Sequence, residues 1–337
     1  MNRSVRYLFQ FLNYLCGGDT GEMKILAYGV SVLLLLLNYG CQWQSSTVKV
    51  IKDLEYANYR DRGKTKSLLL DLYLPSDNVG NSSELPLIIY IHGGGWREFS
   101  KEICPGEIVA QKGWAIACIN YRYSTEAIFP AQIHDAKAAV RWLKANAKEY
   151  NLDPDRFAAW GASAGGHLSL LLGTSEGVAS LEGDLGNSDY SSSVKAVCSF
   201  YAPTDFTLVK PAFTADISEQ KNWQQYKEVP WYLYTVVTTL LLGGAVTENI
   251  ELARSANPIT YLDSQDPPVM IIHGEQDKIV PVNQSDILVE ALQKHDVPVT
   301  YIRKPEMTHT YEGENGEKFD PELLTLVLDF MQEHIGD

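Results

Sequence analysis

The chain has 337 residues, enough for one large domain with additional segments or for two small domains. Hydrophobic residues make up 45% of it and charged residues 21%, which is typical of a globular protein and excludes a disordered, collagen-like or multi-span membrane chain. With 28 basic and 42 acidic residues the net charge is −14, so we expect no nucleic-acid partner and no charge-driven binding to anionic membranes.

Residues 1–44 are predicted to be an export signal, not part of the folded domain. Ile25–Leu37 is a mostly apolar stretch that follows Lys24. It is shorter than the roughly 20 residues of a transmembrane helix and is typical of the hydrophobic region of a secretion signal. Met23 is a candidate for the true start of the protein. We therefore expect an exported protein.

The end of this segment also resembles a bacterial lipoprotein signal. Gly40 and Cys41 match its last two residues, whereas Asn38 and Tyr39 depart from the usual pattern. A lipid on Cys41 and an uncleaved N-terminal anchor both stay open. The expected location is therefore secreted, periplasmic or lipid-anchored in the envelope, with membrane attachment through the N-terminus only.

From about Thr47 onward, strands and helices are predicted in alternation. Short apolar or alternating runs predict strands at Val48–Tyr56, Leu68–Leu74, Leu87–Ile91, Trp114–Tyr121, Phe157–Trp160, Val194–Tyr201, Val269–His273 and Val299–Ile302. Helices are predicted at Ile133–Tyr150, which Asn151–Asp155 ends, and at His167–Leu172, Asn283–Lys294 and Pro321–Ile335. This order predicts an α/β fold with a mostly parallel central sheet and helices on both faces.

Residues 206–257 do not fit the alternation and are predicted to be an inserted segment of one domain at 45–337. A structureless loop of this length is improbable, and Trp231–Leu242 supplies an apolar part. The insertion leaves from the carboxyl end of a strand, where ligands bind in such sheets, which favours a lid or cap over the site. An enlarged packing helix is the alternative.

The five cysteines are Cys16, Cys41, Cys104, Cys118 and Cys198. An odd, sparse set without a CxxC pair predicts neither a disulfide framework nor a zinc or redox motif. Cys118 and Cys198 lie in apolar strand-like runs, so we expect buried core thiols.

The first chemical motif is GxSxG at Gly161–Gly165, with Ser163 at its centre. It lies between a predicted strand and a predicted helix, which is the context that a nucleophilic serine needs. A sharp turn there projects the hydroxyl above the sheet, at a helix N-terminus whose dipole favours a developing anion. Ser163 is the candidate nucleophile.

The second motif, HGGGW at His92–Trp96, directly follows the strand Leu87–Ile91. Consecutive glycines let backbone N–H groups turn toward one point, where the oxyanion of a tetrahedral intermediate would lie. The N–H of Ala164 would complete this hole. A phosphate-binding loop is disfavoured, because no Lys-Ser/Thr follows and GxGxxG is absent.

An acid and a base should follow the serine in the chain. Asp277 comes shortly after the strand Val269–His273, and His309 comes after the strand Val299–Ile302. Both lie in loops at the same rim of the sheet as Ser163. His309 would take the proton of Ser163, and Asp277 would fix the imidazole tautomer.

Other polar residues compete for these roles. Asp205 is an alternative acid, although ordering the start of the insertion is the favoured interpretation. We expect His92 to order the glycine loop, His167 to pack behind the nucleophile and His273 to hydrogen-bond locally. No cluster has metal-ligand spacing, so no metal is expected.

Together these motifs resemble the α/β-hydrolase superfamily, and HGGGW with GASAGG resembles its hormone-sensitive-lipase-like carboxylesterases. Further segments are similar to bacterial bifunctional feruloyl and acetyl-xylan esterases: Phe129–Trp142, Asp153–Arg156, Phe200–Phe206 and His273–Pro281. The resemblance covers about residues 65–330 without most of the insertion, and the sequence departs from it at Ala162, where many relatives carry Asp.

This resemblance implies ester hydrolysis through a covalent acyl-enzyme, without a cofactor. The implied roles are the nucleophile Ser163, the base His309, the orienting acid Asp277 and the oxyanion donors Gly94, Gly95 and Ala164, with Gly93 less clearly a donor. Trp96 would line the substrate pocket or pack under the loop.

The expected function is therefore a serine carboxylesterase acting on short-chain acyl esters, small or polysaccharide-borne, such as acetyl or feruloyl esters of plant polysaccharide. An arylformamidase-like amidase, a peptidase and a lipase with Trp231–Leu242 as its lid are alternatives of the same fold. A non-catalytic binding protein is disfavoured, because Ser163, Asp277 and His309 are all present. The sequence indicates no oligomeric state.

Overall fold

The computed structural model describes residues 48–76, 83–209, 230–313 and 318–336. The chain divides into Met1–Ser45 and Ser46–Asp337, and every described residue belongs to the second unit. The predicted export signal, with Met23 and Cys41, lies outside the described residues. None of the helices in the described ranges is long and apolar enough to cross a membrane.

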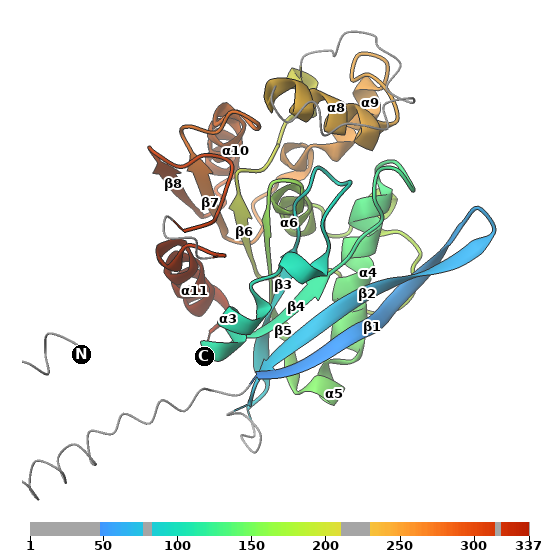
Figure 1. Cartoon of the computed structure of the whole chain (residues 1–337), viewed down its shortest axis with the longest axis vertical. Coiled ribbons are helices and arrows are strands. Elements are labelled where there is room, and N and C mark those ends of the chain that lie inside the picture. The colour runs from blue at the N-terminus through green and yellow to red at the C-terminus, as the bar shows by residue number, and fades with distance from the viewer. Residues whose placement is uncertain (1–47, 77–82, 210–229, 314–317, 337) are drawn as a thin grey trace, which may run out of the picture. The chain divides into compact units, whose positions relative to one another are not determined.

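The core of this unit is an eight-stranded sheet in the order β1-β2-β4-β3-β5-β6-β7-β8 (Figure 1). The strands are β1 (Val48–Asp61), β2 (Lys64–Pro75), β3 (Leu85–Ile91), β4 (Ala115–Ile119), β5 (Leu152–Ala162), β6 (Ala196–Phe200), β7 (Val269–Gly274) and β8 (Val299–Lys304). The pairs β1–β2 and β2–β4 are antiparallel, and all other neighbours are parallel. The predicted mostly parallel α/β sheet is confirmed.

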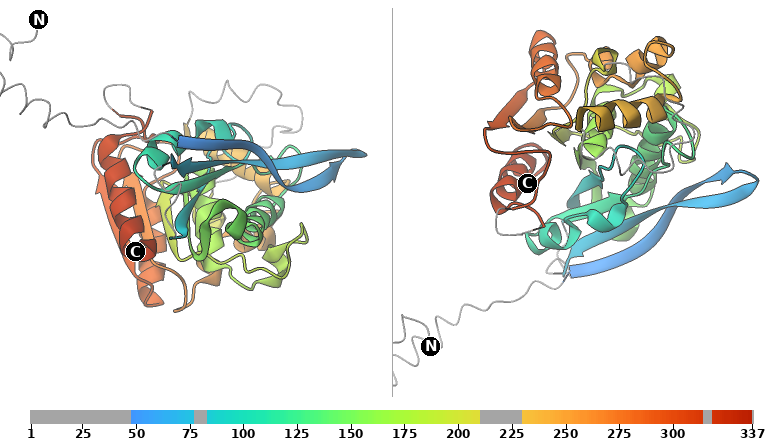
Figure 2. Two further views of the ribbon diagram at one scale, coloured as in Figure 1. Left: turned by 90° about the horizontal axis from the view of Figure 1, so that it is seen from below. Right: turned by 45° about the horizontal axis from the view of Figure 1, so that its top comes forward.

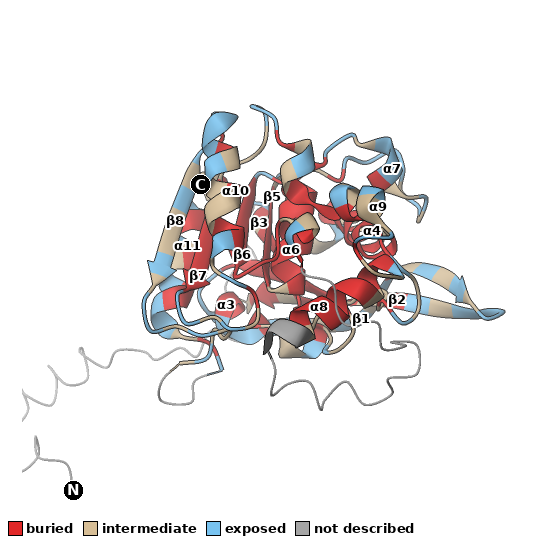
Figure 3. Cartoon of the chain, turned by 90° about the horizontal axis from the view of Figure 1, so that it is seen from above, coloured by how far each residue is buried: buried red, intermediate tan, exposed pale blue. Residues whose placement is uncertain are grey.

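Helices cover both faces of the sheet. The α-helices are α3 (Gly106–Gln111), α4 (Ala131–Ala145), α5 (Ala147–Tyr150), α6 (Ala164–Thr174), α7 (Ala179–Glu182), α8 (Pro230–Leu242), α9 (Ile250–Ala256), α10 (Asn283–Lys294) and α11 (Pro321–Ile335). One core cluster contains side chains of α4, α6 and α10, and the other contains side chains of α3 and α11. Successive residues of β3 alternate between the two clusters, because successive side chains of a strand point to opposite faces. Its apolar run is therefore buried throughout (Figure 3).

Several element boundaries differ from the sequence-based expectation, and the predicted helix Ile133–Tyr150 is divided into α4 and α5. The β1–β2 hairpin continues to Asp61 and Lys64, beyond the predicted ends, and projects away from the rest of the sheet (Figure 2). Its turn residues Arg62 and Gly63 both have positive φ, as a tight hairpin turn requires. Strand β5 begins at Leu152, within the predicted break, because Leu152 pairs with Leu85 of β3.

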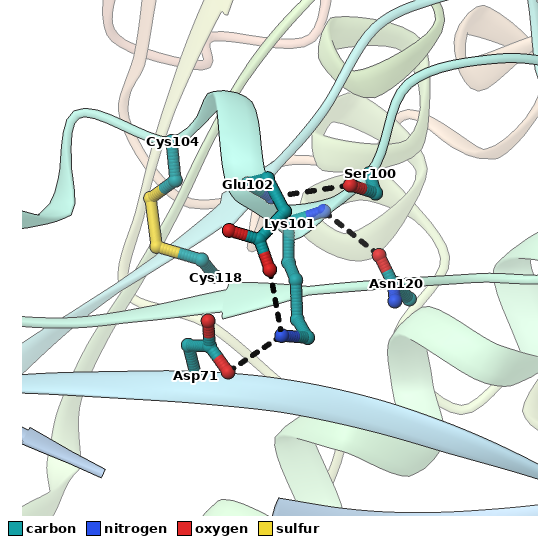
Figure 4. The surroundings of a disulfide bond; sticks show 7 residues. All are labelled: Asp71, Ser100, Lys101, Glu102, Cys104, Cys118 and Asn120. Atoms are coloured by element: carbon teal, nitrogen blue, oxygen red, sulfur yellow. Dashed lines mark hydrogen bonds and ion pairs between the residues drawn. A yellow bond between two sulfur atoms is a disulfide. The ribbon is translucent and has the colours of Figure 1, made fainter. Parts of the chain in front are cut away.

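The expectation for Cys118 is wrong. Cys118 is not a thiol but is joined by a disulfide to Cys104 (Figure 4). Cys198 is a buried free thiol, as expected. Lys101 lies in the short 3₁₀ helix η2 (Lys101–Ile103), and its ammonium group is 2.7 Å from the carboxylate of Asp71 on β2. This anchoring brings Cys104 beside β4, with a Cα–Cα distance of 6.0 Å to Cys118.

The insertion begins at the 3₁₀ helix η3 (Phe206–Leu208) and contains α8 and α9. Its two ends are joined, because the side-chain oxygen of Asn257 accepts from the amide of Phe206 at 2.8 Å. The amide nitrogen of Asn257 donates to Asp205 Oδ1 at 2.9 Å. Residues 210–229 lie outside the described part. The insertion is thus an excursion that starts and ends at the same point of the fold.

Candidate active site

Ser163 stands at the turn between β5 and α6. Its backbone angles are φ 55° and ψ −120°, a combination that L-residues rarely adopt. The turn is held because the Ser163 amide donates to the carbonyl of Phe200 at 2.8 Å. Glycine is required at position 165, since a Cβ atom there would lie 1.9 Å from the carbonyl oxygen of Ile91. The GxSxG spacing therefore packs α6 directly onto the end of β3.

The structure brings the three predicted triad residues together at the carboxyl ends of β5, β7 and β8. Ser163 Oγ lies 3.0 Å from His309 Nε2. On the other side of the ring, His309 Nδ1 lies 2.6 Å from Asp277 Oδ2. A proton can thus pass from the hydroxyl to the imidazole while the carboxylate holds the tautomer.

The surroundings of Asp277 keep its carboxyl group ionised. Its side chain is fully buried, and burial alone would raise the pKa of its carboxyl group. Hydrogen bonds from His273 and His309 outweigh burial and lower that pKa to about 2. In addition, Oδ1 accepts from the backbone amides of Ile279 at 2.8 Å and Val280 at 2.9 Å. The carboxylate is therefore charged and fixed in orientation.

Tyr201 is a site residue that the sequence analysis did not identify. It follows β6, next to the nucleophile strand, and has a positive φ of 37°. Its ring packs on the imidazole of His309, with ring centroids 4.4 Å apart. The only signal in the sequence was its position just after a buried strand neighbouring the nucleophile. The ring supports His309 from the side.

The glycine loop presents backbone donors beside the nucleophile. A Cβ atom at Gly93 would lie 2.9 Å from the carbonyl oxygen of Ala162, so the loop lies against the serine turn. Within the described part of the chain, the amides of Gly94 and Gly95 make no hydrogen bond. The amide of Ala164 belongs to the first turn of α6, where no intrahelical acceptor is available. All three predicted donors are thus available to an oxyanion.

His92 and Tyr121 order this loop from below. His92 Nδ1 donates to the carbonyl of Gly93 at 2.8 Å, and the ring stacks on Tyr121 with centroids 4.4 Å apart. The Tyr121 hydroxyl donates toward the carbonyls of His92 and Gly93 at 3.0 and 3.3 Å. Burial lowers the pKa of His92 to about 4, so its ring is neutral. Both carbonyls are held toward Tyr121.

Trp96 combines both of its predicted positions. It borders the cavity, but it is only 1% exposed and packs beneath the loop. Its indole N–H donates to His167 Nδ1 at 3.2 Å, and its ring contacts Phe206. His167 is therefore a packing residue, as expected.

Asp205 serves the insertion, as the favoured interpretation stated. Asp205 is the N-cap of η3, because its Oδ1 accepts from the amide of Thr207 at 2.9 Å. The same oxygen accepts from the side-chain amide of Asn257. This carboxylate is thereby fixed at the base of the insertion, whereas Asp277 is the carboxylate that contacts His309.

A cavity of about 700 Å³ opens above Ser163. One wall is apolar and consists of Leu233, Tyr234 and Val237 of α8. The lining also includes charged residues: Arg97, Glu98, Glu102, Glu107, Glu312 and Lys318. Within the described residues, no group of three or more His, Cys, Asp or Glu side chains is placed to hold a metal ion. The cavity thus offers both apolar and charged side chains to a substrate.

Comparison with known proteins gives a consistent result. The model of the BD-FAE family matches residues 70–292, about two thirds of the chain. A probable carboxylic ester hydrolase, LipM, of Mycobacterium tuberculosis is 28% identical over 77% of this chain and 56% of its own length. The esterase LipC of the same organism is 27% identical over 81% of this chain and 64% of its own length. The chain thus spans between about half and two thirds of these curated relatives.

Solved structures show the same fold. A truncated carbohydrate esterase from gut microbiota superposes with a TM-score of 0.70 at 29% identity, over 86% of this chain and 97% of that one. A bifunctional GH43-CE protein of Bacteroides eggerthii gives a TM-score of 0.68 at 32% identity, over 84% of this chain and 38% of that one. An esterase of Thermogutta terrifontis, with a TM-score of 0.63 at 22% identity, supports the fold alone.

Proposed function

Since the chain belongs to the BD-FAE family, an α/β-hydrolase family of esterases, we propose that it hydrolyses carboxylic esters with Ser163 as the nucleophile. The observation that carries this proposal is the continuous hydrogen-bonded chain from Asp277 through His309 to Ser163. This series of hydrogen bonds ends at Ser163, beside backbone amides that have no other partner within the described residues.

The reaction proceeds in two steps. Ser163 Oγ attacks the acyl carbon while its proton passes to His309 Nε2, and the oxyanion is bound by the amides of Gly94, Gly95 and Ala164. The intermediate collapses to an acyl-serine, and His309 returns the proton to the departing alcohol. Water, deprotonated by His309, then attacks the acyl carbon. The bond to Ser163 Oγ breaks, His309 returns the proton to this oxygen, and the acid leaves.

We propose short-chain acyl esters of carbohydrate, with acetyl or feruloyl groups, as the substrate class. The apolar side chains of α8 suit the acyl group, and the charged residues of the lining suit the hydroxyl groups of a sugar. The proposal is further supported by the solved relative described as a carbohydrate esterase.

Hydrolysis of p-nitrophenyl esters from acetyl to decanoyl tests the proposal. We expect acetyl to butyryl esters to be the best substrates and Ser163→Ala to lose about 10³-fold or more of kcat. Ser169→Ala is the matched control, because Ser169 lies on the same helix and only bonds the carbonyl of Gly165. Inactivity of the wild type on every ester would contradict ester hydrolysis. A rise in rate above the solubility limit of a long-chain ester would instead support a lipase.

Export of the chain is the second part of the proposal. The Cys104–Cys118 disulfide supports it, because such bonds persist mainly in oxidising compartments. N-terminal sequencing of the mature protein from a bacterial host that expresses all 337 residues is the test. A start near Cys41 supports export, and an N-terminus at Met1 in the cytosolic fraction contradicts it.

A further inference from the structure

We propose that His273 is a positioning residue that holds the Asp277 carboxylate in the orientation that His309 needs. This inference rests on the proposed ester hydrolysis and adds a second imidazole to the carboxylate end of the triad. From the sequence, only local hydrogen bonds were expected of His273.

His273 lies at the carboxyl end of β7 and is completely buried. Its Nε2 atom is 3.0 Å from the carbonyl oxygen of Val280 and 3.3 Å from Asp277 Oδ2. Its Nδ1 atom is 2.7 Å from the hydroxyl of Ser285 at the start of α10. Both ring nitrogens are thus engaged by fixed parts of the fold.

These partners determine the tautomer of His273. The Val280 carbonyl and the Asp277 carboxylate can only accept, so Nε2 carries the hydrogen and is shared between them. In the neutral ring, Nδ1 is then an acceptor, and the Ser285 hydroxyl donates to it. The Val280 and Asp277 acceptors therefore fix the tautomer, and Ser285 supplies the donor that this tautomer needs at Nδ1.

The contact with Asp277 is placed where it affects catalysis. Oδ2 is the oxygen that also receives the N–H of His309, at 2.6 Å. The other oxygen is held by the two backbone amides of Ile279 and Val280. Without His273, Oδ2 would have His309 as its only donor among the described residues. The carboxylate could then move together with the His309 imidazole and would orient it less well.

Two other titratable groups face this pair. His309 is reached through Asp277, and the Tyr201 ring lies 6.4 Å from the His273 ring, between centroids. Tyr201 also packs on His309, so its phenol ring contacts both imidazoles. The Asp277 carboxylate contacts both as well. A change at His273 should therefore be detected in the protonation of His309 in the working enzyme.

The test compares His273→Gln with His273→Asn in the full chain. Glutamine can place an N–H donor near the position of Nε2, whereas the shorter asparagine reaches only the position of Nδ1. We expect His273→Gln to retain most of kcat on p-nitrophenyl acetate and His273→Asn to lose about 10- to 100-fold, with KM little changed. The acid limb of kcat/KM against pH should move to higher pH in His273→Asn only, because a carboxylate with one donor fewer stabilises an imidazolium more strongly.

Thermal unfolding of both variants separates positioning from folding. Equal activity of the two variants, or a loss in His273→Asn without a shift of the acid limb, would overturn the proposal. Ser285→Ala keeps the imidazole but removes the donor to Nδ1, and we expect a smaller loss of kcat in the same direction. An inactive wild type would instead refute ester hydrolysis itself, so the two failures are distinguishable.

Discussion

His167 links the nucleophile helix to the glycine loop through a neutral ring. Its Nδ1 accepts from the indole of Trp96, and its Nε2–H donates to the carbonyl of Ala256 at 2.7 Å. A second proton would break the bond to Trp96. Burial lowers the pKa of His167 to about 4, which agrees with this arrangement.

The neutral histidines make folding stability depend on pH. An unfolded histidine has a pKa near 6.5, so between about pH 6.5 and pH 4 the unfolded chain binds protons that folded His167 does not. The contribution of neutral His167 to the free energy of unfolding is thus complete above pH 6.5 and is lost as the pH falls toward 4. We expect the free energy of unfolding to fall by about 2 kcal/mol for His167 between pH 7.5 and pH 5. Urea unfolding of wild type and His167→Gln at both pH values measures this, and an unchanged pH dependence in the variant would refute it.

The meeting of Ser163, His309 and Asp277 could be predicted from the sequence, because GxSxG and two strand-end loops fix their order and their edge of the sheet. Tyr201 and His273 could not be assigned their contacts. Their roles depend on which side chains of neighbouring strands β6 and β7 meet beneath His309, and no spacing in the sequence encodes that contact.

Helix α8 packs directly onto the glycine loop. A Cβ atom at Gly95 would lie 2.8 Å from Val237 Cγ1, and Gly95 has a positive φ of 57°. The insertion therefore braces Gly95, one of the proposed oxyanion donors, in addition to lining the cavity.

Shortening Val237 should loosen this brace. We expect Val237→Ala to lower kcat on a short-chain ester by about 10-fold, because a displaced donor no longer meets the oxyanion. Leu233→Ala is the control, since Leu233 lines the same cavity but is not among the nearest neighbours of a Cβ at Gly95. Equal kcat values for the two variants would show that α8 does not brace the loop.

The strands could be predicted because most of them are buried on both faces and appear in the sequence as unbroken apolar runs. The predicted bounds of α10 and α11 agree with the structure. Short helices such as α3 and α9 were not predicted, because a helix of one or two turns is stabilised by tertiary packing more than by its own sequence. The polar end of the β1–β2 hairpin was not predicted either. It has no buried face, so its sequence shows no apolar pattern.

The disulfide ties the cavity rim to the sheet of the whole domain. Cys104 borders the cavity, and Cys118 lies in β4. Cysteine spacing could not reveal this pair, because the anchoring of η2 to Asp71 is a contact between distant segments. The domain fold therefore determines a covalent bond that the cysteine pattern argued against.

Reduction should destabilise the domain. The bond joins residues 14 apart in the sequence, and a loop of this size predicts a loss of about 3 kcal/mol when it opens. We expect Cys104→Ala to lower the Tm by several degrees and to abolish any further effect of reductant. Cys198→Ala should keep the response to reductant, because Cys198 is a free thiol. An identical Tm for wild type with and without reductant would contradict the prediction.

The central claim is that Ser163 is the activated nucleophile of the molecule, and covalent labelling tests it most directly. The native protein would be treated with a fluorophosphonate, digested and analysed by peptide mass spectrometry. We predict one phosphonyl group on Ser163, slow labelling in His309→Ala and none at this position in Ser163→Ala. Labelling of another residue, or ester hydrolysis that persists in a protein with no label on Ser163, would contradict the account.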